Sequence, residues 1–290
     1  MIGKAREEKR TRPGVVQAAL LASLAMAGWA HAGGARCWID KGALVAPAAF
    51  GDIAGDFLID LSAPTSALHV TRANEDGLEG EAATRDLVIA GRRLAGVTLP
   101  IVDLDARTAK FDTAINGVIG VDVLRRFIVE IDPAACRLRL LSSRPGLWRG
   151  GVRLAISTAG GRPLAPVRIT DGVQVRTGHF AIDTADWPTT VGDARLSRPQ
   201  IADRTSPVRL RAMEVGGRLF EQVPAVVQPQ GGPAPGGTPP EEEARGAIGM
   251  AVWSQWRLRL DIRNGWLELA PPGRRQVPAF AGTSRRGGAG

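Results

Sequence analysis

Residues 117–127 read GVIGVDVLRRF, and residues 246–256 read GAIGMAVWSQW. Each run places two glycines around apolar residues and continues with an amphipathic stretch, which predicts a short helix over 121–127 and another over 250–256. Strand-like alternation follows both runs, and each strand turns back into a further strand. The second of these turns contains Asn264-Gly265, a strong hairpin signal. The same structural unit is therefore expected twice in this chain.

Two further blocks repeat upstream of these runs. FLIDLS at 57–62 returns as FAIDTA at 180–185, and DLVIAGRRL at 86–94 is echoed by RAMEVGGRL at 211–219. The nine-residue blocks each predict two strands around a glycine turn. Asp60 precedes Gly120 by 60 residues, and Asp183 precedes Gly249 by 66. Three blocks in one order at matched spacing indicate an internal repeat.

The repeat sets the expected domain organisation. We expect two homologous all-β lobes, at 33–147 and 148–270. The longer spacing in the second half is assigned to a flexible Pro/Gly-rich loop at 229–244. The last segment, 271–290, is expected to be a disordered basic tail.

The first 32 residues are predicted to be an export signal. A basic start is followed by an apolar stretch over 15–27 and by the small-x-small pattern Ala30-His31-Ala32. The stretch is shorter than the roughly 20 residues that a membrane span needs, although an uncleaved anchor remains the alternative. We expect a mature chain that begins near Gly33, periplasmic or secreted, with no stable membrane insertion.

Charge and composition exclude several classes of protein. The net charge is +8, of which residues 1–32 contribute +3 and the tail contributes +4, so the body is close to +1 and has no basic stripe for nucleic acid. No Cys/His cluster has metal-ligand spacing, and no Gly-x-Ser-x-Gly elbow supports a serine hydrolase. In an oxidising compartment Cys37 and Cys136 are a disulfide candidate, with two unlinked buried thiols as the alternative.

These blocks resemble the retropepsin- and pepsin-like aspartic peptidases, especially exported bacterial members with a retroviral-type repeat. The resemblance covers nearly all of 43–142 and 151–270. It implies an all-β fold of two acid-protease-like barrel lobes with short helices and a cleft between the lobes. It also implies a peptide or protein substrate, no metal and no cofactor. Two lobes in one chain remove the need for a dimer, so a monomer is expected.

The resemblance assigns roles to individual residues. Asp60 and Asp183 match the catalytic pair, in which two neighbouring carboxyl groups share one proton and activate a water molecule. Thr184 matches a hydroxyl that hydrogen-bonds across to the opposite loop. Gly120 and Gly249 match the glycines that let a later strand pass close to each Asp loop.

The sequence also departs from the family pattern, mainly in the first Asp motif. Leu61 stands where a hydroxyl is expected and cannot make the cross-lobe bond. Ser62 replaces glycine and would either crowd Asp60 or hydrogen-bond to it, and Ala185 is a milder departure. Three hypotheses follow: an active aspartic endopeptidase, an inactive homologue that binds peptides or proteins in the cleft, and a β-rich exported domain whose aspartates are ordinary turn residues.

Overall fold

The computed structural model describes residues 34–192, 207–227 and 244–272. The predicted signal segment, nearly all of the Pro/Gly-rich loop and the basic tail lie outside these residues. Within the described parts of the chain, no helix has the length and apolar character to cross a membrane.

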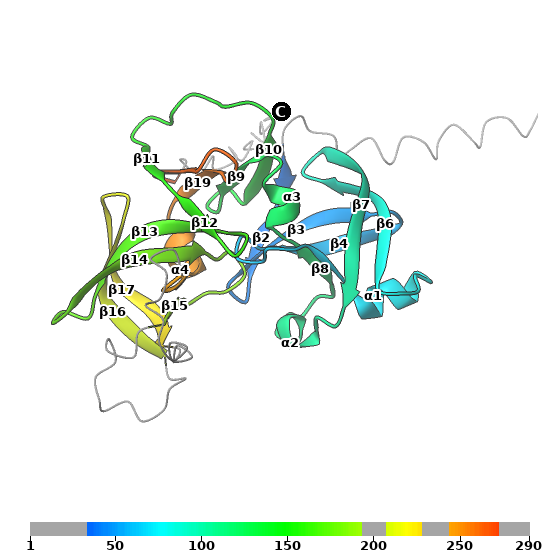
Figure 1. Ribbon diagram of the computed structural model, residues 1–290, viewed down its shortest axis with the longest axis horizontal. Coiled ribbons are helices and arrows are strands. Elements are labelled where there is room, and N and C mark those ends of the chain that lie inside the picture. The colour runs from blue at the N-terminus through cyan, green and yellow to red at the C-terminus, as the bar shows by residue number, and fades with distance from the viewer. Residues whose placement is uncertain (1–33, 193–206, 228–243, 273–290) are drawn as a thin grey trace, which may run out of the picture. The chain divides into compact units, whose positions relative to one another are not determined.

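The first half of the chain closes into a six-stranded β-barrel (Figure 1). Around the barrel the strands follow the order β3 (Ala43–Phe50), β4 (Ile53–Ile59), β8 (Ile115–Ile119), β5 (Ala67–His69), β7 (Arg92–Val102) and β6 (Ala82–Ile89). Strand β6 pairs back with β3 and closes the ring, while β2 (Trp38–Asp40) extends it on the outside of β3. A closed ring leaves no long unpaired strand edge.

The second half repeats this ring with the same order of pairings. Its strands follow the order β13 (Arg162–Thr170), β14 (Val175–Ile182), β18 (Gly246–Ile248), β15 (Thr189–Val191), β17 (Arg218–Val227) and β16 (Pro207–Val215), and β16 pairs back with β13. Strand β12 (Ser157–Ala159) takes the place that β2 has in the first ring. The predicted all-β fold of two homologous barrels is confirmed.

A third sheet joins strands from both halves. Its order is β1 (Ala35–Arg36), β10 (Arg137–Leu141), β9 (Ile128–Asp132), β19 (Arg257–Asp261), β20 (Trp266–Ala270) and β11 (Val152–Ala155). At its centre β9 and β19 run antiparallel, with Glu130 opposite Arg259. These two residues hold equivalent positions in the repeat, so a pseudo-twofold axis passes between them.

A buried charge cluster lies at this centre. The Arg259 guanidinium is 2.8 Å from the Glu130 carboxylate and 3.2 Å from that of Glu268. All three residues are buried, and Arg153 adds a second cation 3.1 Å from Glu268. The Trp148 ring stacks on Arg259, whose guanidinium carbon is 3.9 Å from the ring centroid. Their mutual attraction and hydrogen bonds offset the cost of removing these charges from water.

The helices are few and short: α1 (Val70–Glu75), α2 (Asp105–Thr108), α3 (Val121–Leu124) and α4 (Met250–Trp253). The last two begin directly after Gly120 and Gly249, where the sequence predicts them, but end three residues earlier than predicted. The second and third residues after each helix form turns, because their N–H groups bond the carbonyl three residues back, as from Phe127 to Leu124.

Candidate functional site

The two aspartates follow strands that end in the same way in each barrel. Strand β8 lies between β4 and β5, parallel to the first and antiparallel to the second, so the chain leaving β4 must form a loop before it can enter β5. Asp60 is the first residue of that loop, and its N–H donates to the Ile119 carbonyl at 3.0 Å. In the second barrel the Asp183 N–H donates to the Ile248 carbonyl, also at 3.0 Å.

The paired glycines allow the close approach that the sequence predicts. A Cβ atom placed on Gly120 would lie 2.6 Å from the Ala63 carbonyl oxygen, and one on Gly249 would lie 2.3 Å from the Pro188 carbonyl oxygen. Both contacts are with the backbone of the adjacent Asp loop, which cannot move aside cheaply. Only glycine fits at either position.

Each carboxylate is oriented by its own loop. Oδ1 of Asp60 accepts hydrogen bonds from the N–H groups two and three residues later, at 2.7 and 3.1 Å, and Oδ1 of Asp183 does the same at 2.8 and 3.2 Å. The Ser62 hydroxyl also donates to Oδ1 of Asp60, at 2.7 Å. Of the two roles open to Ser62, the structure therefore has the hydrogen bond. The Ala185 side chain is buried beside its loop.

The two loops are joined by half of the expected cross-lobe bonding. The Thr184 hydroxyl donates to the Ile59 carbonyl at 2.5 Å and accepts from the Leu61 N–H at 3.1 Å. The Leu61 side chain instead packs into the hydrophobic core, where it is 1% exposed. Because a leucine offers no hydroxyl, the reciprocal bond from the first loop is absent, as the sequence predicts.

The surroundings of Asp183 change its protonation. Burial raises the pKa of Asp183 from 3.8 to about 7, and the negative charges of Asp60 and, less strongly, Asp186 add to the effect. At acidic pH Asp183 can therefore carry a proton and donate it. The Thr184 hydroxyl, bonded to the Ile59 carbonyl and the Leu61 N–H on either side of Asp60, holds the two Asp loops next to each other.

Arg107 is the residue at this site that the sequence did not reveal. Its guanidinium forms an ion pair with Oδ2 of Asp60, a carboxylate that is only 1% exposed. Comparing the two halves of the chain can find only residues that both halves share. The segment equivalent to that of Arg107 lies between β17 and β18, largely outside the described residues, so no repeat singled it out.

Arg107 belongs to a segment, residues 104–112, that we call the strap. Lys110, also in the strap, bonds the loop of the other aspartate, with its Nζ 2.8 Å from the Asp186 carboxylate and 3.1 Å from the Ala185 carbonyl oxygen. Two more contacts join the strap to the first barrel: His69 Nε2 lies 3.1 Å from the Asp105 carboxylate, and Lys41 forms an ion pair with Asp112 at 3.0 Å. The strap thus contacts both Asp loops.

Cys37 and Cys136 lie side by side away from the Asp loops. Their sulfur atoms are 3.0 Å apart and not covalently linked, and the Cys37 N–H donates to the Cys136 carbonyl at 3.1 Å. The hydrogen bond between the sulfurs raises the pKa of Cys37 and lowers that of Cys136. The disulfide stays a prediction, and it would require the sulfurs to approach by about 1 Å.

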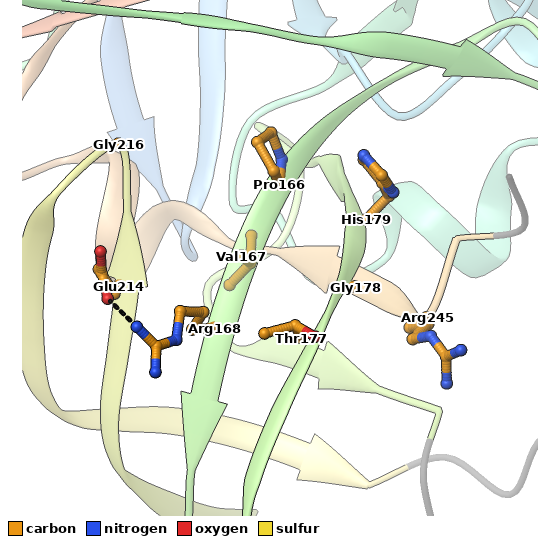
Figure 2. A pocket seen from close by; sticks show the side chains of 9 residues that line it. All are labelled: Pro166, Val167, Arg168, Thr177, Gly178, His179, Glu214, Gly216 and Arg245. Carbon is orange, nitrogen blue, oxygen red and sulfur yellow. Dashed lines mark ion pairs between the residues drawn. The ribbon is translucent and has the colours of Figure 1, made fainter. Parts of the chain in front are cut away.

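Other candidate sites offer less chemistry. Among the residues that the structure describes, no three His, Cys, Asp or Glu side chains are grouped to hold a metal ion. Figure 2 shows an open hollow on the second barrel, where Arg168 points toward Glu214 across 3.5 Å while His179 and Arg245 lie on the other side. Neither aspartate of the pair lines this hollow.

Comparison with known proteins supports the architecture. No protein-family model and no curated protein matches the sequence. Among solved structures, the crystal structure of the aspartic proteinase from Irpex lacteus matches with a TM-score of 0.53 and 12% identity, covering 84% of this chain and 98% of that protein. At this identity the likeness concerns the fold, and the chain has the two-barrel fold of a pepsin-like aspartic proteinase.

Proposed function

We propose that this protein is an aspartic-type endopeptidase, in which Asp60 and Asp183 together activate a water molecule for peptide-bond hydrolysis. One observation carries the proposal. Two buried aspartates occupy equivalent loops of two homologous barrels, and the charge of one raises the pKa of the other. Ordinary turn residues would not need this burial, because a carboxylate loses solvation when water is excluded.

The two aspartates take different parts in the proposed reaction. Asp60 accepts a proton from the water molecule while the oxygen of that water attacks the peptide carbonyl carbon. Asp183 donates its proton to the carbonyl oxygen, which becomes a hydroxyl of the tetrahedral intermediate. Asp60 then gives its proton to the leaving nitrogen, and a hydroxyl of the intermediate returns its proton to Asp183 as the C–N bond breaks and the product carboxyl group forms, so the pair again holds one proton. Thr184 and the two glycines keep the loops in register.

The test is cleavage of a broad peptide library by the mature chain between about pH 4 and 8. We expect activity to fall as the pH passes about 7, where Asp183 loses the proton that it must donate. Asp60→Asn and Asp183→Asn should abolish cleavage, whereas Asp86→Asn, in an exposed ion pair of the β6–β7 hairpin, should not. A statine-type peptide should inhibit. Cleavage that survives both active-site substitutions would refute the proposal.

A second candidate is an inactive homologue that binds peptides or proteins at the same loops. The ion pair between Arg107 and Asp60 favours it, because a carboxylate held by a guanidinium is a poor base. Calorimetry separates the two candidates. Peptides that bind at the loops and are recovered intact, with Asp60→Asn leaving affinity unchanged, would favour the binding function.

Export is part of the same proposal. We infer a periplasmic or secreted monomer whose mature chain begins near Gly33, since the leader pattern precedes that residue. N-terminal sequencing after expression in a bacterium with the native leader tests this. An intact N-terminus retained in the membrane fraction would favour the anchor reading instead.

A further inference from the structure

The strap leaves Asp60 without a free oxygen. Oδ1 already accepts three hydrogen bonds from the residues that follow it, and the remaining oxygen, Oδ2, is paired with the Arg107 guanidinium. A carboxylate acting as a base needs a lone pair that can reach a water proton. In this arrangement the cation holds the position that the water would need.

The second aspartate loop is held by the same segment. Lys110 bonds both the Asp186 carboxylate and the Ala185 carbonyl oxygen, so a single stretch of chain spans from the loop of Asp60 to the loop of Asp183. Arg107 and Lys110 thus lie directly against the two Asp loops that a peptide substrate would have to contact. The strap therefore competes with substrate as well as with water.

The attachment of the strap is largely electrostatic. Residues 105–107 and 109–110 are exposed, and the only described strap side chains that pack in an apolar cluster are Leu104 and Phe111 near its ends. The cations Arg107 and Lys110 form the middle contacts, and His69 and Lys41 hold Asp105 and Asp112. Such a segment can lift at its middle while its apolar ends stay anchored.

His69 shows how the strap is kept in register. Its Nδ1 accepts a hydrogen bond from the Thr71 N–H at 3.3 Å, so the neutral ring carries its proton on Nε2 and donates it to Asp105. The ring is buried, and Thr108 also lies 3.3 Å from Nε2. This contact fixes α2 at the point from which Arg107 reaches Asp60.

We propose that the strap is a built-in inhibitor, with Arg107 as the group that blocks Asp60 and Lys110 as its second attachment. This inference rests on the proposed peptidase function. Release of the strap exposes Oδ2 of Asp60 and the backbone of the second loop together, so one movement turns the site on.

The test compares Arg107→Met with the parent full chain. Methionine keeps the apolar length of the side chain and removes the charge. Arg107→Lys keeps a charge, and Arg93→Met serves as a matched control because Arg93 pairs with Asp86 in the same barrel, away from the strap. Two measurements are made on each protein: kcat/KM on a cleaved library peptide, and amide hydrogen exchange across residues 104–112.

We expect Arg107→Met to raise kcat/KM by about tenfold, the size of one charge-assisted hydrogen bond, and to speed exchange in the strap. Arg107→Lys should lie between, and Arg93→Met should match the parent. About 0.5 M NaCl should raise the parent rate more than that of Arg107→Met, since salt screens the exposed pairs.

Two results would overturn the inhibition, and they differ in what else they refute. If the parent cleaves peptides and Arg107→Met is no faster, the strap is no inhibitor while the peptidase function stands. If exchange shows an open strap in Arg107→Met and neither protein cleaves any peptide, the peptidase function fails, and the inhibition fails with it.

Discussion

At the level of single residues, Asp183 combines burial, a neighbouring negative charge and a raised pKa. The folded protein binds its proton with a pKa of about 7, against an ordinary value of 3.8. The folded state therefore holds more protons than the unfolded chain between these values, and the free energy of unfolding falls as the pH rises through them. Above pH 7 the buried charge destabilises the fold.

Asp183→Asn should reverse this loss, because asparagine stays neutral at every pH. At pH 8 we expect the variant to be more stable than the parent by up to about 4 kcal/mol, the equivalent of the pKa difference. At pH 4 the two should be nearly equal. Urea unfolding of both proteins at pH 4 and at pH 8 measures this difference in unfolding free energy. Equal stability at pH 8 would show that burial at this loop does not raise the pKa.

Thr184 is the second residue whose contribution to stability can be measured. Thr184→Val keeps the shape of the side chain and deprives the Ile59 carbonyl and the Leu61 N–H of their partner, both in buried surroundings. We expect a loss of about 2–4 kcal/mol in unfolding free energy. Thr84→Val, in an exposed Thr–Thr pair 2.9 Å apart, is the control and should change little. A loss no larger than in the control would mean that the loops are joined by other contacts.

Asp183 could be predicted because both halves carry the aspartate, whereas Thr184, whose counterpart is Leu61, was predicted from the resemblance to the aspartic peptidases. Ser62 and Leu61 could be identified as departures, and their effect at Asp60 followed from what a hydroxyl or a leucine can bond. Arg107 could not be predicted, because its contact depends on how a strap without a described counterpart folds back over the loop. An internal repeat identifies the residues that both halves share. Residues that differ between the halves, such as Leu61, Ser62 and Arg107, determine how Asp60 can react.

At the level of elements, the hairpin of β9 and β10 carries Cys136 on its turn beside Cys37, at the junction of β1 and β2. We expect these cysteines to be linked in the exported protein. The bond would close a loop of nearly 100 residues around the first barrel and stabilise it by about 2–4 kcal/mol. Reductant should lower the melting temperature of the parent but not of Cys136→Ser. Two free thiols in protein isolated without reductant would contradict this.

Strands and turns were the most predictable elements. The Asn-Gly and Gly-Gly turns lie where the hairpin signals put them, and both short helices start at the expected glycines. Their length was overestimated, because the apolar residues that extend the periodic pattern belong to the turns entering β9 and β19. Helix α1 shows the limit in another way, since its six residues, 70–75, give no marked periodic signal in so short a span.

At the level of the whole molecule, the charge cluster at the centre of the shared sheet joins the two halves. Arg259→Met would leave the buried Glu130 without its nearest cation, at a cost of about 3–5 kcal/mol. The double variant Glu130→Met and Arg259→Met should recover most of this stability, because Glu268 keeps Arg153. Chemical unfolding of the parent, both single variants and the double variant gives the coupling energy. Additive losses would show that the pair does not act as a unit.

The sequence did not predict that the two halves share a sheet, although it predicted both of the strands that pair there. Alternation in 128–132 and 257–261 says which faces are apolar, but it does not say that β9 pairs with β19. Each strand has a charged residue at its middle, and on its own such a residue resembles a solvent-facing position. Only the partner strand turns Glu130 and Arg259 into buried residues.

The pairing of Glu130 with Arg259 has a consequence for the association of the two halves. In a symmetric dimer of identical lobes, the residue on the axis meets its own copy. Two copies of the first half would oppose carboxylate to carboxylate, and two copies of the second would oppose guanidinium to guanidinium. Like charges facing each other without a partner oppose association, so the charges at this position favour the pairing of the two different halves over the pairing of either half with a copy of itself.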